Sequence, residues 1–160
     1  MGSQWFSDAR EMFAAAREAA LDMERARRQL EMLEGGGRGR ADGPKVRAGS
    51  IADPMRRVDG IIDRSRVLEA RIETDAELVD YACSVLYGRE QDGRGGVCVL
   101  CSPLHADVLW WRYPGAATWE QVGMAVGYSR TRCKELAAEA LDLCDAYGPD
   151  AVLDGRGLAT

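Results

Sequence analysis

Apolar positions in the first part of the chain recur at alternating steps of three and four residues. The series comprises Ala9, Met12, Ala16, Ala19, Met23, Ala26, Leu30 and Leu33. This spacing places apolar side chains along one face of a helix and is typical of a heptad seam, so it predicts a long helix over about residues 5–34. Gly35 to Gly37 should end it. Because Ala and Met bury less area than Leu and Ile, we expect this helix to pack against another.

A second long helix is predicted over about residues 54–89, because Asp53 can cap it and Pro54 suits its first turn. Its near-heptad positions are Met55, Val58, Ile62, Ser65, Leu68, Ile72, Val79, Ala82 and Leu86. The intervening stretch holds glycines, Pro44 and the cations Arg38, Arg40, Lys45 and Arg47, which indicates a flexible basic linker. The seams can be buried within one chain or between two chains. We expect a coiled-coil-like hairpin that also contributes to a homo-oligomer, a dimer.

Two shorter helices separated by a turn are predicted near the C-terminus. Thr118 and Gln121 have the spacing of a capping box, Gly127 suits a left-handed helix end, and Ser129 can cap the next helix. This order matches a helix-turn-helix. The second helix should bury one face, formed by Cys133, Leu136, Ala137, Ala140, Leu141 and Cys144. A helix that starts at Ser102 and Pro103 should contribute Leu104, Val108, Leu109 and Trp111 to the same core.

The candidate DNA-binding residues lie in the first turns of the helix that Ser129 is predicted to cap. These are Ser129, Arg130, Thr131, Arg132, Lys134 and Glu135. Recognition helices present such side chains to base edges while neighbouring cations hold phosphates. Cations near a helix N-terminus oppose the helix dipole, which favours a role other than helix stability. The alternative is an ordinary solvated helix end.

The segment resembles a known family. Arg112-Tyr113, Thr118-Trp119-Glu120, Gly127-Tyr128-Ser129 and Ala140-Leu141 are similar to the promoter-reading C-terminal domain of sigma factors. The resemblance is closer to the phage transcriptional regulators of the ArpU type. It covers about residues 104–146 and implies DNA contact by Arg130, Thr131, Lys134 and Glu135. Gly123 and Met124 depart from the family pattern and should weaken the first helix slightly.

Composition and charge argue against a membrane-spanning protein and against one that binds nucleic acid over its whole surface. The chain has 160 residues, is 46% apolar and carries a net charge of −5, which argues against indiscriminate nucleic-acid binding. No apolar stretch approaches the roughly twenty residues that cross a bilayer, and the N-terminus lacks a signal pattern. We therefore expect a cytoplasmic protein with no membrane partner, and the resemblance to phage regulators implies a bacterial host cell.

Cys98, Cys101 and His105 have a spacing that zinc sites use. No second compact pair accompanies them, and Cys133 and Cys144 fall on an apolar face, so we expect no cofactor and five reduced thiols, with zinc as the weaker alternative. We also expect no enzyme, because the sequence shows no orienting partner for His105 and no phosphate-binding glycine motif.

The sequence thus predicts an all-α protein. Two long helices should occupy residues 1–90, a sigma-like helix-turn-helix domain residues 98–147, and a flexible tail residues 148–160. We expect a sequence-specific transcriptional regulator of phage or prophage origin that binds double-stranded DNA, with RNA polymerase as a second partner. The alternatives are a small terminase subunit for DNA packaging and a protein-interaction module that contacts RNA polymerase.

Overall fold

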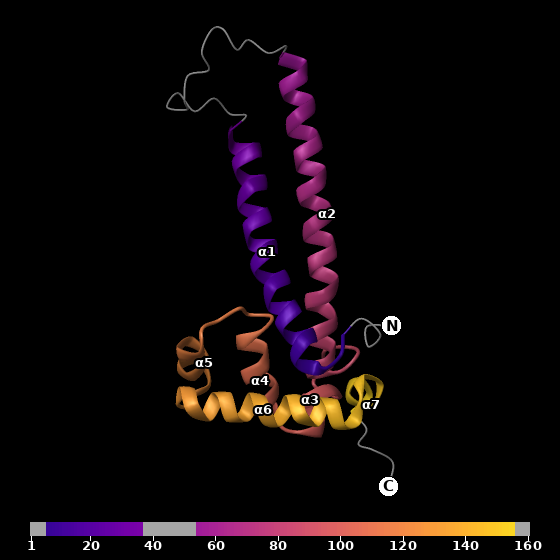
Figure 1. The fold of residues 1–160 in the computed structure, drawn as a ribbon, viewed down its shortest axis with the longest axis vertical. Coiled ribbons are helices and arrows are strands. Elements are labelled where there is room, and N and C mark those ends of the chain that lie inside the picture. The colour runs from indigo at the N-terminus through magenta and orange to yellow at the C-terminus, as the bar shows by residue number, and fades with distance from the viewer. Residues whose placement is uncertain (1–5, 37–53, 156–160) are drawn as a thin grey trace. The chain divides into compact units, whose positions relative to one another are not determined.

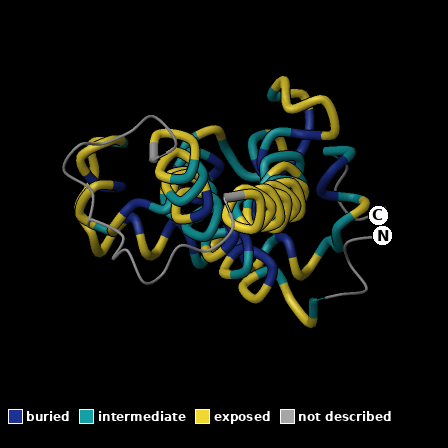
Figure 2. Tube along the Cα trace, turned by 90° about the horizontal axis from the view of Figure 1, so that it is seen from above, coloured by how far each residue is buried: buried dark blue, intermediate teal, exposed yellow. Residues whose placement is uncertain are grey.

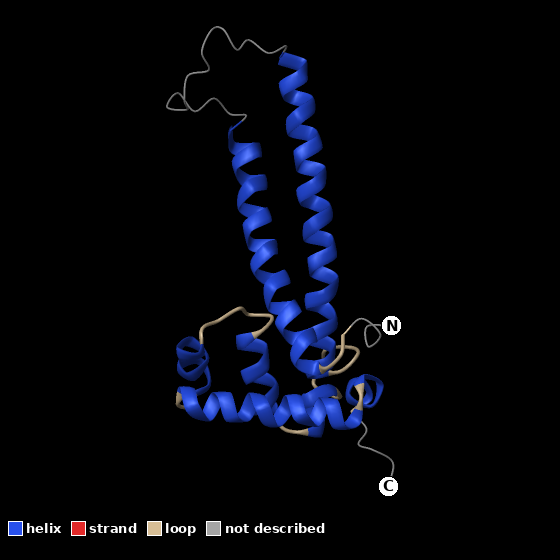
Figure 3. Cartoon of the chain, in the orientation of Figure 1, coloured by secondary structure: helices blue, strands red, loops and turns tan. Residues whose placement is uncertain are grey.

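The computed structural model describes residues 6–36 and 54–155, and the regular structure in these ranges is entirely α-helical (Figure 1, Figure 3). The helices are α1 (Ala9–Gly36), α2 (Pro54–Tyr87), α3 (Gly96–Leu100), α4 (Pro103–Arg112), α5 (Trp119–Val126), α6 (Arg130–Tyr147) and α7 (Pro149–Asp154). The all-α prediction is confirmed, and both long helices end within a few residues of their expected bounds. The predicted basic linker and the Asp53 cap lie outside the described residues.

The long helices are divided between two compact units. One unit comprises Met1–Leu21 with Ala76–Thr160, and the other comprises Asp22–Asp75. Met12, Phe13 and Ala16 of α1 belong to the same buried cluster as Leu109 of α4 and Leu136 of α6. The bases of α1 and α2 therefore pack with the C-terminal helices, whereas the sequence pattern assigned both helices to one domain of residues 1–90.

The larger unit is built around α6, which packs against α4, α5 and α7 (Figure 1). All six residues of the predicted buried face of α6 are buried, and Cys133 and Ala140 are fully inaccessible. Phe13 of α1 is also fully buried, and its ring centroid lies 5.6 Å from that of Tyr113. The helix-turn-helix thus shares its core with the base of α1.

The predicted flexible tail begins instead with a helix. Residues 149–154 form α7, in which Val152 is fully buried and Leu153 is 7% exposed. A glycine-rich loop admits this helix, since a Cβ on Gly95 would lie 2.6 Å from the carbonyl oxygen of Leu153. Arg89 Nε also donates to Asp154 Oδ1 at 2.7 Å. The expectation of fraying after Gly148 is therefore wrong as far as Gly155, and residues 156–160 lie outside the described range.

In the smaller unit, residues 22–36 of α1 pair with residues 54–75 of α2. Arg71 contacts Asp22, and Arg64 Nη2 donates to Gln29 Oε1 at 2.9 Å. These contacts show that the two helices are antiparallel. From Asp22 to Gln29 the chain moves forward along α1, and the partners, from Arg71 to Arg64, move back along α2 by the same number of residues. Ala26 and Leu68 are the fully buried apolar side chains described in this unit.

The first turns of α2 depart from the predicted seam. Met55, Val58 and Ile62 are 63%, 47% and 43% exposed, and the half-buried position is Ile61 rather than Ile62. Exposed positions predominate along this end of α2 (Figure 2). Extending the antiparallel register along α1 places Gly35 level with Val58, and a Cβ on Gly35 would meet nothing within 4 Å. The predicted seam is therefore correct from Ser65 onward and wrong before it.

Candidate nucleic-acid interface

The first helix of the candidate interface, α5, begins at a complete capping box. Thr118 Oγ1 accepts a hydrogen bond from the Gln121 amide at 3.2 Å, and Gln121 Oε1 accepts one from the Thr118 amide at 2.9 Å. These bonds satisfy two amides that a helix start leaves without partners. The predicted start of the helix-turn-helix is confirmed.

Two glycines shape the turn between α5 and α6. Gly127 has φ +81°, the left-handed conformation that the sequence predicted for it. Gly123 lies inside α5, where a Cβ would come within 2.6 Å of the Tyr128 carbonyl oxygen. Gly123 therefore lets the turn approach α5 closely. This contact gives the glycine a packing role that its departure from the family pattern did not suggest.

Ser129 caps α6, because its hydroxyl accepts a hydrogen bond from the Arg132 amide at 3.1 Å. The Ser129 hydroxyl therefore serves as the N-cap of α6, as the sequence predicted. Arg130, Thr131 and Lys134 follow with exposed side chains, and no other described residue forms a side-chain hydrogen bond or an ion pair with them. Arg130 and Lys134 are four residues apart and share one flank of the helix. These three side chains form the open part of the candidate interface.

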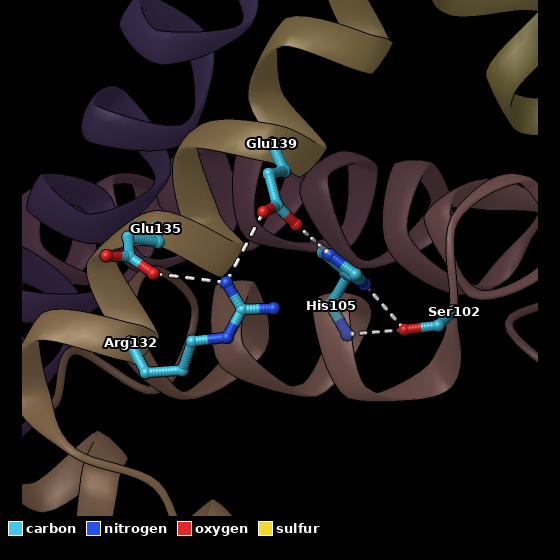
Figure 4. Close-up of polar contacts among 5 residues, drawn as sticks. All are labelled: Ser102, His105, Arg132, Glu135 and Glu139. Atoms are coloured by element: carbon cyan, nitrogen blue, oxygen red, sulfur yellow. Dashed lines mark hydrogen bonds and ion pairs between the residues drawn. The ribbon is translucent and has the colours of Figure 1, made fainter.

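Arg132 lies on a different flank of α6 and has protein partners. Its Nη1 atom donates to Glu135 Oε2 at 3.1 Å and to Glu139 Oε1 at 3.4 Å (Figure 4). The hydrogen bond to Glu135 raises the pKa of Arg132 further. Two of the predicted DNA-contacting residues, Arg132 and Glu135, therefore contact each other in the DNA-free chain. Sequence spacing does contain this signal, since residues three apart on a helix are neighbours.

Glu139 also joins α6 to α4. Its Oε2 atom lies 2.7 Å from His105 Nε2, and His105 Nδ1 lies 2.6 Å from Ser102 Oγ (Figure 4). The hydrogen bond from His105 lowers the pKa of Glu139. His105 therefore has two partners, contrary to the expectation that none orients it. The Ser102 hydroxyl also accepts the His105 amide at 3.1 Å, so it serves as the N-cap of α4.

The predicted zinc ligands are not assembled into a ligand set. Both ring nitrogens of His105 contact Ser102 and Glu139, and the described residues contain no group of three or more His, Cys, Asp or Glu side chains placed to hold a metal ion. Burial raises the pKa of the Cys98 and Cys101 thiols.

The turn between α4 and α5 is held by Arg17 and Arg112, to which the sequence analysis assigned no structural role. Arg17 Nη1 of α1 donates to the carbonyl oxygens of Arg112 and Ala117, at 2.7 and 2.9 Å. Arg112 Nη1 donates to the same Ala117 oxygen at 3.1 Å, and its guanidinium lies 4.7 Å from the Trp119 ring centroid. Ala117 directly precedes the Thr118 cap, so these arginines act on the start of the helix-turn-helix.

Carboxylates limit how basic the candidate interface is. Glu135, Glu139, Asp142 and Asp145 follow the cations along α6. Asp142 is partnered by Arg10 of α1 at 2.9 Å. The described cations of α6 without a carboxylate partner, Arg130 and Lys134, therefore lie in its first turns.

Comparisons with known proteins assign no family to this chain, since no family model, curated protein or solved structure matches it. None of the described helices combines the length and the apolar character that a bilayer crossing requires.

Proposed function

We propose that the chain is a sequence-specific transcriptional regulator that binds double-stranded DNA through the N-terminal turns of α6. In this proposal α6 enters the major groove, and Arg130 and Lys134 contact guanine edges or phosphates. Thr131 contributes to base choice. Arg132 pairs with Glu135 and Glu139, and its guanidinium reaches DNA only after these ion pairs break.

One observation carries the proposal. Arg130 and Lys134 are exposed side by side on a capped helix-turn-helix, and no described carboxylate pairs with either. Every other arginine of α4 to α6 contacts protein groups, with Arg112 on Ala117 and Trp119, and Arg132 on glutamates. Two open cations on a recognition-type helix are the arrangement that phosphate and base contacts require.

The proposal includes a bacterial cytoplasmic setting, a phage or prophage origin and self-association. A dimeric helix-turn-helix protein reads two half-sites, which gives self-association a use. RNA polymerase is the proposed second partner. The sequence resemblance to ArpU-type regulators supports these points, because those regulators combine a helical N-terminal part with a sigma-like domain.

The test is selection of bound duplexes from a random oligonucleotide pool, followed by titration of the selected duplex. The double variant Arg130→Ala with Lys134→Ala should lower affinity at least about a hundredfold, since two phosphate or base contacts are lost. Its helical circular dichroism should match the parent protein. Arg27→Ala with Arg66→Ala removes the same charge from exposed positions of the smaller unit and should have little effect. Equal affinity of the first variant and the parent would remove the proposal.

One observation favours a second candidate function, a protein-interaction module. Trp111 is 41% exposed, so its predicted place in the core is wrong, and Met124 is 81% exposed. Both line a groove beside the α4–α5 turn that also includes Ala116 and Gln121. Exposed apolar side chains of this size can mark a protein contact. Binding to RNA polymerase that persists at high salt, together with no duplex selected from the pool, would favour this candidate over DNA binding.

A further inference from the structure

We infer that Arg17, on the N-terminal helix α1, is a positioning residue for the proposed DNA-binding surface. This inference rests on the proposed function. Arg17 contacts neither α5 nor α6 through its side-chain hydrogen bonds, and it is about a hundred residues away in sequence from the turn that it contacts. It would act by holding the α4–α5 turn in the conformation from which the helix-turn-helix begins.

The turn needs such support because its backbone is unusual. Ala116 has φ +54°, a conformation that residues other than glycine rarely adopt. A Cβ on the preceding Gly115 would lie 2.8 Å from the Trp111 carbonyl oxygen. Local backbone bonds join Gly115 to Trp110 and Ala117 to Trp111, at 2.7 and 2.9 Å. The turn is therefore tight, and contacts from outside it must favour this conformation over relaxed ones.

Arg17 supplies contacts at both ends of the turn. The Arg112 carbonyl belongs to the last residue of α4, where a helix leaves carbonyls without amide partners and favours a nearby cation. The Ala117 carbonyl is at the far end, next to the Thr118 cap of α5. A single guanidinium nitrogen bonds to both oxygens. This bridge fixes the separation between the end of α4 and the start of α5.

The charges around this bridge support a positioning role. Both cations donate to the Ala117 oxygen, and no described carboxylate forms an ion pair with Arg17 or Arg112. The pKa of Arg112 is lowered by burial and by the neighbouring Arg17 charge, and its buried Nε atom has no hydrogen-bond partner. Placing two cations together is unfavourable. The arrangement persists because the carbonyl contacts and the Trp119 face compensate for it.

The first arm of the test measures amide hydrogen exchange in the full-length protein. In Arg17→Met, amides of residues 115–122 should exchange about tenfold faster, because local opening of the turn is eased. The buried amides of α6 should keep their exchange rates. Arg17→Lys should be intermediate, since one ammonium group cannot reproduce the bridge as well as a planar guanidinium. Arg10→Met is the matched control on α1, because it removes a surface ion pair with Asp142.

The second arm measures DNA affinity against salt concentration for the same variants. Arg17→Met should weaken binding about tenfold without changing the slope of log affinity against log salt, because Arg17 does not contact phosphate. A slope reduced by about one would assign Arg17 a phosphate contact and overturn the inference. Unchanged exchange at residues 115–122, or faster exchange spread evenly over the chain, would also overturn it. If the parent protein binds no DNA, the proposed function fails, and the exchange arm alone still decides whether Arg17 holds the turn.

Discussion

Arg132 and Glu139 lie on one flank of α6, with the Nη1 atom of the arginine 3.4 Å from the Oε1 atom of the glutamate. The other oxygen of Glu139 contacts His105 of α4, so the carboxylate is held from two sides (Figure 4). Arg132 is therefore the cation of the candidate interface whose access to DNA depends on a competing protein contact.

Weakening that competition at Glu139, with the Glu135 contact left in place, should strengthen DNA binding. In Glu139→Gln the neutral amide holds Arg132 less firmly, and we expect affinity to rise about threefold to tenfold as the guanidinium reaches phosphate. Asp142→Asn is the control, because it removes a carboxylate of α6 that pairs with Arg10 instead. Fluorescence anisotropy titrations would measure both. An equal gain for the two variants would mean that net charge, and not release of Arg132, sets the affinity.

The two glycines of the helix-turn-helix should respond differently to alanine. Gly127→Ala should cost about 1 kcal/mol in the free energy of unfolding, the cost of a left-handed conformation with open space around it. Gly123→Ala should cost more, about 2 kcal/mol or above, because its Cβ meets the Tyr128 carbonyl. Urea unfolding followed by circular dichroism would measure both values. The reverse order would contradict the packing role assigned to Gly123.

Asp75 should make the stability of the smaller unit depend on pH. Burial and the neighbouring Asp22 raise the pKa of Asp75 to about 6, and its Oδ2 atom is buried without a hydrogen-bond partner. Arg71 lowers the pKa of Asp22 to about 2. Since the folded chain holds the Asp75 proton more tightly than the unfolded chain, stability should fall as pH rises from about 4 to 6.

Asp75→Asn should remove this loss. The variant should be more stable than the parent protein at about pH 8, by about 1 kcal/mol, and nearly equal to it at about pH 4. Thermal unfolding across this range would show the difference, with Glu73→Gln as an exposed control on the same helix. A gain of the same size at both pH values would show that the effect does not come from titration of Asp75.

The C-terminal helix α7 should contribute to stability. Val152 is fully buried, so Val152→Ala should lower the free energy of unfolding by about 2 kcal/mol. Val99→Ala shortens a valine that is 49% exposed and should change it by less than about 0.5 kcal/mol. Denaturant titrations of both variants provide the measurement. Near-zero effects of both would restore the flexible tail that the sequence indicated.

Local sequence signals predicted the helix-turn-helix well because each one acts over a few residues. The Thr118 box, the Gly127 end and the Ser129 cap all depend on hydrogen bonds between near neighbours in sequence. The buried face of α6 followed from helical periodicity. These features needed no knowledge of the rest of the chain.

Contacts between distant segments could not be predicted in the same way. Arg17 reads as one polar residue of an amphipathic helix, and nothing near it in sequence indicates the Ala117 carbonyl that it contacts. The packing of α7 depends on Gly95, since a Cβ there would lie 2.6 Å from the Leu153 carbonyl oxygen. Val58 belongs to the predicted seam and is nevertheless 47% exposed. Heptad spacing identifies an apolar stripe, and the partner helix decides which part of it is buried.

The most direct test of the central claim is the salt dependence of duplex binding by the parent protein and by Arg130→Ala with Lys134→Ala. Parent affinity should fall steeply with added salt, and the double variant should reduce the slope of log affinity against log salt by about two, because each lost phosphate contact removes about 0.9. The same slope for both proteins, or no duplex bound by the parent at low salt, would contradict this claim.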